Sequence, residues 1–127
     1  MVEEKKKIRS FTDLNAWREG HKLVLMVYKA TKGFPTEERF SLTDQIRRAV
    51  VSITNNIAEG FSRNSNKEKI KFFNTSQASL TEVQNQLLIA KDLSYLVKDD
   101  FAKIAQQTIV VNKLLSGLVK SARVLNT

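Results

Sequence analysis

Side chains that could do chemistry are scarce in this sequence. It has no cysteine, and His21 is its only histidine. Helical periodicity places His21 on the apolar face of the first predicted helix, between Trp17 and Tyr28, which indicates a core histidine and not a catalytic base. Glu59 and Glu82 could pair as carboxylates across two helices, but neither stands in the Glu-x-x-His arrangement of di-metal helical bundles. Since no P-loop, G-x-G-x-x-G or G-x-S-x-G motif is present either, the sequence predicts no enzyme, no metal site and no cofactor.

Cations cluster in the stretch FSRNSNKEKIK, residues 61–71. The stretch is predicted to form a loop and the first turn of a helix, where free backbone N–H groups and the helix dipole attract anions. We therefore predict a surface that binds the phosphates of nucleic acid. Its residues are Arg63, Lys67, Lys69 and Lys71, with help from the N-terminal run Lys5, Lys6 and Lys7. The alternative is a solubilising loop, in which Asn66 acts only as a helix N-cap.

A second candidate surface lies in the stretch TDQIRRAVVSITNNIAEGFSRN, residues 43–64. Read as a helix, the stretch has one apolar face, and Arg48, Asn55 and Glu59 fall on the opposite face. Arg48 near the helix start and Glu59 in its last turn both oppose the helix dipole, and they are too far apart to pair with each other. We expect each to find a partner in another subunit; solvation and a ligand site are the alternatives. The predicted oligomer interface comprises Arg48, Val51, Asn55 and Glu59.

Apolar residues off the core stripes also favour an oligomer. Val51, Phe72 and Ile89 are predicted to point away from the core. Several such residues on one bundle indicate that other subunits cover part of its outer surface.

The chain is strongly basic. It carries 21 Lys and Arg residues against 13 Asp and Glu, a formal net charge of +8, and its pI is near 9.9. Such an excess attracts polyanions without specifying the fold. No apolar run approaches the roughly 18 residues of a membrane span, and the charged start MVEEKKKIRS is not followed by an apolar segment. We therefore expect a cytoplasmic protein with no membrane span and no secretory signal.

Four amphipathic stretches lie between the breaks of the chain at Gly33, Pro35, Gly60 and the aspartates at 99–100. Helices are predicted at 13–31, 41–60, 66–95 and 99–125. Their expected ends are an N-cap at Asp13, a variant capping box at 41–44 and Gly60 as a C′ residue. Because short connections force neighbouring helices to reverse direction, we predict an all-α fold, an antiparallel up-down-up-down four-helix bundle. The predicted single domain covers residues 11–127 and follows a basic N-terminal tail, residues 1–10.

Four motifs give the chain a family resemblance. They are F-x-D-L-x-A-W at 11–17, F-P-x-E-E-R-F-x-L-T-x-Q-I-R-R-A at 34–49, S-I-x-x-N-I-A-E-G-F-x-R at 52–63 and S-L-x-E-V-x-x-Q-L at 79–87. Together they resemble the ribosomal-RNA (23S rRNA) intervening-sequence protein family of four-helix bundle proteins. The resemblance implies an antiparallel bundle that assembles into a cyclic homopentamer. A more distant relative, the accessory protein of diversity-generating retroelements, is a basic pentamer that binds a reverse transcriptase and nucleic acid.

Two functional hypotheses of different classes follow. The first is a non-enzymatic oligomeric bundle that binds RNA or other nucleic acid through a basic surface. The alternative is a protein-interaction scaffold or accessory subunit that binds an acidic protein partner, for example a reverse-transcriptase-like protein, without nucleic-acid contact. Because the sequence lacks interleaved aromatic and basic residues and any base-reading motif, we expect nucleic-acid binding to depend on charge or shape.

Overall fold

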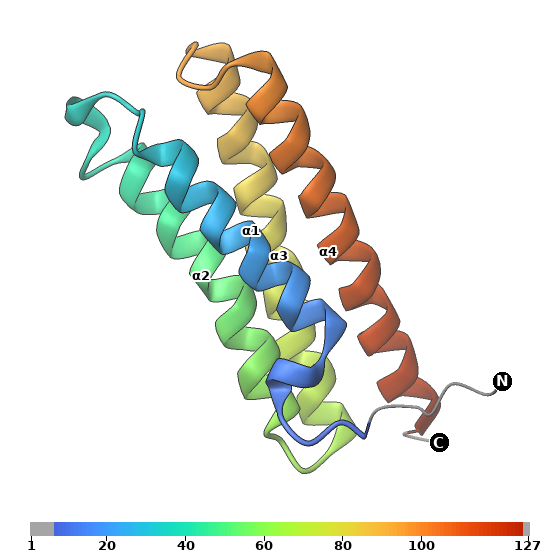
Figure 1. Ribbon diagram of the computed structural model, residues 1–127. Coiled ribbons are helices and arrows are strands. Elements are labelled where there is room, and N and C mark those ends of the chain that lie inside the picture. The colour runs from blue at the N-terminus through green and yellow to red at the C-terminus, as the bar shows by residue number, and fades with distance from the viewer. Residues whose placement is uncertain (1–6, 126–127) are drawn as a thin grey trace, which may run out of the picture.

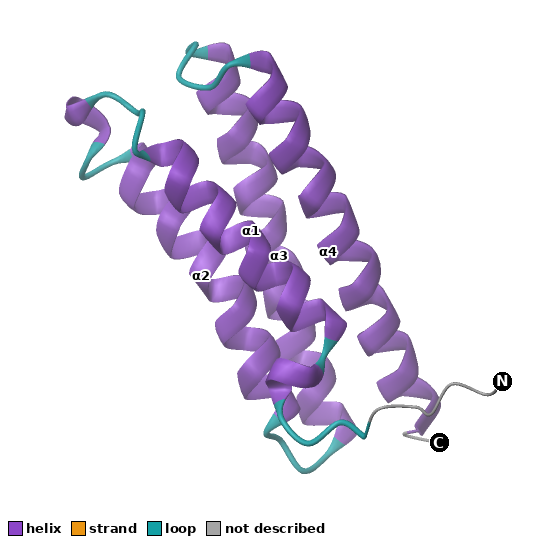
Figure 2. Cartoon of the chain, viewed as in Figure 1, coloured by secondary structure: helices purple, strands orange, loops and turns teal. Residues whose placement is uncertain are grey.

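Four long helices make up most of the structure in the computed structural model, which describes residues 7–125 (Figure 1, Figure 2). They are α1 (Asn15–Thr31), α2 (Leu42–Phe61), α3 (Asn66–Asp92) and α4 (Lys98–Leu125). Two single-turn 3-10 helices, η1 (Phe11–Asp13) and η2 (Thr36–Glu38), precede α1 and α2. No strand occurs between residues 7 and 125, so the predicted all-α four-helix bundle is confirmed.

Each helix packs against the next one in the chain, and α4 packs back against α1. Hydrogen bonds fix the relative direction of α3 and α4. Gln84 Nε2 donates to Thr108 Oγ1 at 3.1 Å, whereas Gln77 Nε2, which lies earlier in α3, donates to Ser116 Oγ, later in α4, at 3.0 Å. α3 and α4 are therefore antiparallel, and Figure 1 shows the same reversal from α1 to α2 and from α2 to α3.

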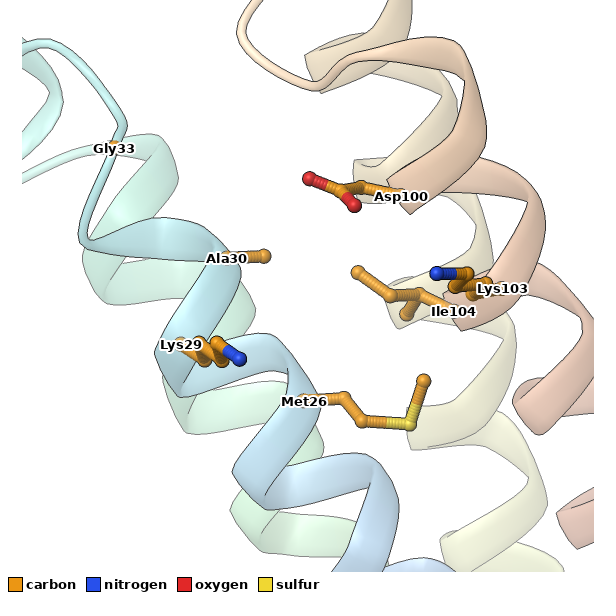
Figure 3. A pocket seen from close by; sticks show the side chains of 7 residues that line it. All are labelled: Met26, Lys29, Ala30, Gly33, Asp100, Lys103 and Ile104. Carbon is orange, nitrogen blue, oxygen red and sulfur yellow. The ribbon is translucent and has the colours of Figure 1, made fainter.

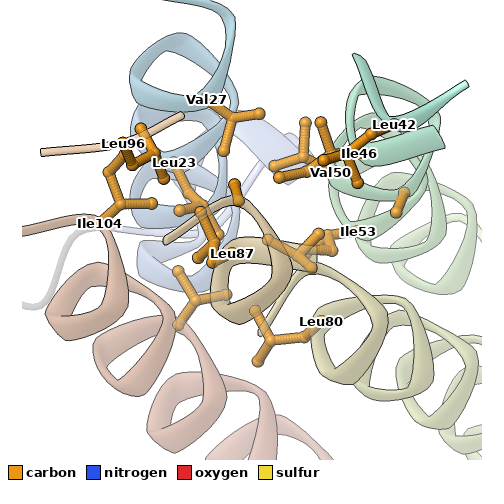
Figure 4. Packing of buried hydrophobic residues seen from close by; sticks show 14 of the residues in the cluster. Leu23, Val27, Leu42, Ile46, Val50, Ile53, Leu80, Leu87, Leu96 and Ile104 are labelled. Atoms are coloured by element: carbon orange, nitrogen blue, oxygen red, sulfur yellow. The ribbon is translucent and has the colours of Figure 1, made fainter. Parts of the chain in front are cut away.

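Aliphatic side chains from all four helices form one core along the bundle axis (Figure 4). The fully buried members include Leu23 and Val27 of α1, Ile46 and Ile53 of α2, Leu80 and Leu87 of α3, and Val111 and Leu115 of α4. Burying each Leu or Ile side chain of this kind contributes about 1.5–3 kcal/mol. The predicted apolar stripe of α2 faces this core, since Leu42, Ile46, Val50, Ile53 and Ile57 are all buried.

The connection between α3 and α4 differs from the predicted one. We expected the third helix to reach residue 95 and the break to lie at the aspartates 99–100, but α3 ends at Asp92 and the aspartates lie in the first turn of α4. There they face the positive end of the helix dipole, which favours carboxylates. Ser94 takes a left-handed φ of 64°. The Ser94 and Tyr95 amides donate to the carbonyls of Lys91 at 2.9 Å and Ala90 at 2.8 Å, which is the Schellman pattern of helix termination.

Local hydrogen bonds also correct three predicted helix starts. Ser10 and Asp13 form a capping box on η1, so Asp13 is not the N-cap of α1. Ser41 makes no cap on α2, because its hydroxyl donates to Glu38 Oε1 at 2.6 Å, and the capping box predicted at 41–44 is wrong. Ser65, and not Asn66, caps α3 by accepting the Glu68 amide at 3.1 Å.

Gly60 lies inside α2 and is buried, so its predicted role as a C′ residue with a left-handed backbone is also wrong. Its role is close packing. A Cβ atom at this position would stand 2.7 Å from Phe73 Cε1 and 3.0 Å from Phe72 Cβ. The absence of a side chain therefore lets α2 approach the aromatic start of α3.

At the other end of the bundle from Gly60, a hydrogen bond joins the α1–α2 connection to the α3–α4 connection. The Tyr95 hydroxyl donates to Glu38 Oε2 at 3.1 Å. The Ser41 hydroxyl, with a smaller contribution from Tyr95, lowers the pKa of the Glu38 carboxyl below its ordinary value. Burial is the main cause that raises the pKa of Tyr95, and Glu38 adds to it. The lowered pKa keeps Glu38 ionised as the acceptor, and the raised pKa keeps Tyr95 protonated as the donor. Both pKa shifts therefore favour the hydrogen bond between the two connections.

We predict opposite effects of alanine at two helical glycines. Gly60→Ala should destabilise the fold by about 1–3 kcal/mol, because Phe73 must move. Gly117→Ala in α4 should stabilise it by about 0.5–1 kcal/mol, because the new Cβ meets no atom within 4 Å beyond its own stretch of helix and alanine favours the helix. Urea unfolding followed by circular dichroism at one fixed protein concentration measures both. Equal effects of the two substitutions would contradict the close contact at Gly60.

We also predict that Ser94→Gly stabilises the fold by about 0.5–1 kcal/mol, because glycine adopts the left-handed conformation without the Cβ penalty. Ser62→Gly is the matched control, since Ser62 ends α2 with an ordinary φ of −76°. The control should be neutral or destabilising in the same unfolding experiment. A stabilisation common to both variants would rule out backbone strain at Ser94 as the cause.

Candidate nucleic-acid interface and oligomer surface

The connection between α2 and α3 carries exposed cations at one end of the bundle, the end at which α1 begins and α4 finishes (Figure 1). Lys67 and Lys71 are exposed one turn apart on α3. The Arg63 guanidinium lies over the Phe72 ring at 4.5 Å and is also exposed. Lys7 is exposed as well, whereas Lys5 and Lys6 lie outside the described residues. We call Lys7, Arg63, Lys67 and Lys71 the basic end.

Lys69, the remaining predicted phosphate ligand, is bound within the chain. Its ammonium donates to the carbonyl oxygen of Phe61 at 2.7 Å and lies 3.4 Å from that of Gly60. These carbonyls end α2, where the helix dipole favours a cation. The Lys69 side chain is half-buried and caps α2. Sequence spacing did not reveal this role, because Lys69 lies on α3 and the carbonyls that it caps lie on α2.

Two cations that the sequence analysis did not single out lie on α4, near the same end. Lys120 and Arg123 line a hollow of about 370 Å³ between α3 and α4, together with Asn74, Gln77 and Ser116. The sequence does point to a basic surface on this helix, because residues 101–125 contain no Asp or Glu.

The predicted interface residues do share one face. Arg48, Val51, Asn55 and Glu59, which we call the α2 outer face, line a groove of about 700 Å³ that Tyr28 of α1 also borders. Arg48 differs from expectation, because its Nε donates to Asp44 Oδ2 at 2.9 Å within α2. Arg48 therefore has a partner within its own helix, and its contact with another subunit stays a prediction. No described side chain pairs with the Glu59 carboxylate.

A smaller hollow of about 320 Å³ adjoins this face between α2 and α3. Gln86 reaches it, and its Oε1 atom is buried with no hydrogen-bond donor anywhere in residues 7–125. Buried amide oxygens normally have a hydrogen-bond partner, which at the edge of an open hollow includes water. The Asn56 amide bonds within its own helix, since its Nδ2 donates to the Ser52 carbonyl at 2.8 Å.

The apolar residues predicted to point away from the core are less exposed than expected. Val51 is half-buried and packs against the core, and Phe72 is half-buried beneath Arg63. Ile89 is 39% exposed. Leu88 on α3 and Ile109 on α4 were not predicted to be exposed, but they are 46% and 44% exposed.

His21 is not a core residue, which corrects the prediction. It is exposed, and its ring stacks on Trp17 with 4.8 Å between the ring centroids. Glu59 and Glu82 line different hollows. Among the residues described, no three His, Cys, Asp or Glu side chains gather as a metal site would require. No helix in residues 7–125 combines the length and apolar character needed to cross a membrane.

A further hollow of about 440 Å³ separates α1 from the start of α4 (Figure 3). Met26 and Ile104 point toward each other across it, and Lys29, Asp100 and Lys103 lie around its edges. Its ionisable side chains, Lys29, Asp100 and Lys103, are all exposed, so the hollow shields none of them from water, and we assign no chemistry to it.

Comparison with known proteins identifies the family. No curated protein matches the chain. A solved structure from Bacteroides thetaiotaomicron, described as a protein with unknown function from the S23 ribosomal protein family, has the same fold: the TM-score is 0.76 at 22% sequence identity, over 83% of this chain and 95% of that one. The family model of the 23S rRNA-intervening sequence protein matches residues 12–117. The chain therefore belongs to the 23S rRNA-intervening sequence protein family.

Proposed function

We propose that this chain is a non-enzymatic, homo-oligomeric protein that binds RNA or other nucleic acid through the phosphate backbone. The observation that carries the proposal is the basic end, where Arg63, Lys67 and Lys71 are exposed together beside the start of α3. Free N–H groups and the dipole of a helix start add to the attraction of these side chains for phosphate.

The contacts at the basic end suit phosphates better than bases. Phe72 lies under Arg63, and Phe61 lies near the Lys69 ammonium at 5.5 Å, so neither ring is a free platform for base stacking. Binding of this kind depends on charge and on the shape of the nucleic acid. Its affinity falls as salt rises, because each neutralised phosphate releases condensed counterions.

A salt titration tests this function. We expect the triple variant Arg63→Gln, Lys67→Gln, Lys71→Gln to bind a structured RNA and a duplex DNA more weakly than wild type. The slope of log affinity against log salt should become shallower by up to about 0.9 for each lost contact to B-form DNA. Lys69 stays unchanged because it caps α2.

The control variant is Lys29→Gln, Lys32→Gln, Lys103→Gln, which removes the same charge from exposed lysines at the opposite end of the bundle. Equal losses in the two variants would show non-specific attraction by net charge and no site at the basic end. If wild type binds neither polymer at about 50 mM salt, where phosphate contacts are strong, the nucleic-acid function is wrong and the protein-scaffold alternative replaces it.

The proposed assembly is a homo-oligomer, and the family resemblance implies a pentamer. The α2 outer face supports self-association because it offers Glu59 without an ion-pair partner among the described residues. Sedimentation equilibrium at micromolar concentration measures the mass. A single species near the 14.5 kDa of one chain would disprove the assembly.

We predict that Glu59→Ala shifts the population toward smaller assemblies while each chain stays helical. In the proposed interface Glu59 loses its water and pairs with a cation of the neighbouring copy, so its removal leaves that cation without a partner, at a cost of about 1–3 kcal/mol. Glu37→Ala is the control, because Glu37 is exposed in η2, away from the α2 outer face. Sedimentation velocity measures the assembly of both variants, and circular dichroism checks that they stay helical. Unchanged assembly in Glu59→Ala would show that Glu59 is a solvated surface residue and not part of the interface.

A further inference from the structure

The α3–α4 seam contains an apolar hollow in the half of the bundle nearer the connection between these two helices. The hollow measures about 190 Å³ and is lined by Leu87, Leu88, Phe101, Ala105 and Ile109, with Gln84 and Thr108 at its border. Leu88 and Ile109 are each nearly half exposed there. The hollow can take an apolar side chain from outside, and none of the described residues fills it.

The same seam contains the cationic hollow described above, toward the basic end. Lys120 and Arg123 lie in that hollow with Asn74, Gln77 and Ser116. The two hollows are separated by the hydrogen bonds from Gln84 to Thr108 and from Gln77 to Ser116. At 1.5 Å per residue, their centres lie roughly 15–20 Å apart along the seam.

Carboxylates are absent from the stretch of seam between these hollows. α4 contains no Asp or Glu after Asp100, and α3 contains only Glu82 between Glu68 and Asp92. Glu82 lines the hollow on the other side of α3, next to α2. The seam therefore presents an apolar hollow, then neutral amide and hydroxyl groups, then cations.

We propose that the α3–α4 seam is a docking groove for an acidic amphipathic helix of a partner protein. An apolar side chain of that helix enters the hollow at Leu88 and Ile109, and carboxylates about three to four turns away meet Lys120 and Arg123. The amide side chains between them bond the polar edge of the helix. This is recognition of a helix in a groove, in which apolar residues anchor and charges fix the orientation.

An acidic helix fits this seam better than the other occupants do. Nucleic acid leaves the apolar hollow empty, because its backbone has no apolar group to place there. A second copy of this chain carries a net charge of +8, so it brings an excess of cations to a surface that already lacks carboxylates. The inference goes beyond the proposed nucleic-acid function, which depends on Arg63, Lys67 and Lys71.

The test uses a fluorescein-labelled synthetic helix of about 18 residues, long enough to span both hollows. It carries Leu on one face and Glu on the other, and a scrambled peptide of equal composition has no common Leu face. Fluorescence anisotropy measures the affinity of each peptide for the full chain. We expect the amphipathic helix to bind more tightly than the scrambled peptide.

Two pairs of variants locate the site. Leu88→Asn with Ile109→Asn removes apolar anchors at constant charge, and Lys120→Gln with Arg123→Gln removes the cations. Each pair should weaken binding of the amphipathic helix about tenfold or more, as anchor residues do. Leu25→Asn on α1 and the pair Lys29→Gln with Lys103→Gln are the controls, since these exposed residues lie outside the seam. Circular dichroism checks that all variants stay helical.

Several results would overturn the proposal. Failure of wild type to bind the amphipathic helix, equal binding of the scrambled peptide, or wild-type affinity in Leu88→Asn with Ile109→Asn would each do so. If Lys120→Gln with Arg123→Gln weakens RNA binding but not peptide binding, the seam is a nucleic-acid surface. The triple variant Arg63→Gln, Lys67→Gln, Lys71→Gln should lose RNA binding and keep peptide binding. A failure of the proposed nucleic-acid function can therefore be told apart from a failure of the docking groove.

Discussion

The orientation of α2 is the constraint on which the other features depend. Ile46, Ile53 and Ile57 are fully buried, and Gly60 brings the end of the helix against Phe73. A rotation of α2 about its axis would expose these isoleucines at a cost of about 1.5–3 kcal/mol each. Their burial therefore fixes which polar residues of α2 point outward and how closely the start of α3 can approach. The positions of the α2 outer face and of the basic end both follow from this packing.

Helical periodicity was enough to predict the four helices and the buried stripe of α2, because that stripe repeats without interruption from Leu42 to Ile57. Helix ends were harder to predict, because they depend on contacts that spacing does not encode. Gly60 resembles a C′ glycine in the sequence, yet a contact with another helix explains it. Ser94 occupies a left-handed position without the glycine that normally marks one.

The candidate sites were predictable to a similar degree. The sequence placed Arg63, Lys67 and Lys71 on one exposed surface, but the long-range cap by Lys69 required the fold. The pair between Arg48 and Asp44 has the i, i+4 spacing and could have been found from the sequence alone. The α3–α4 seam could not have been found in this way, because its two hollows depend on how two helices pair across a turn.

The surfaces of this chain differ in their balance of charge. The groove along the α2 outer face contains two arginines, Arg47 and Arg48, and two carboxylates, Asp44 and Glu59, so its formal charges cancel. A chain of net charge +8 repels copies of itself over most of its surface, and a locally neutral face minimises that repulsion when copies meet. The basic end and the α3–α4 seam lack this balance, because their cations outnumber the nearby carboxylates. Self-association through α2 would thus leave the unbalanced cations exposed, and each added copy would increase the attraction of the assembly for an anionic partner.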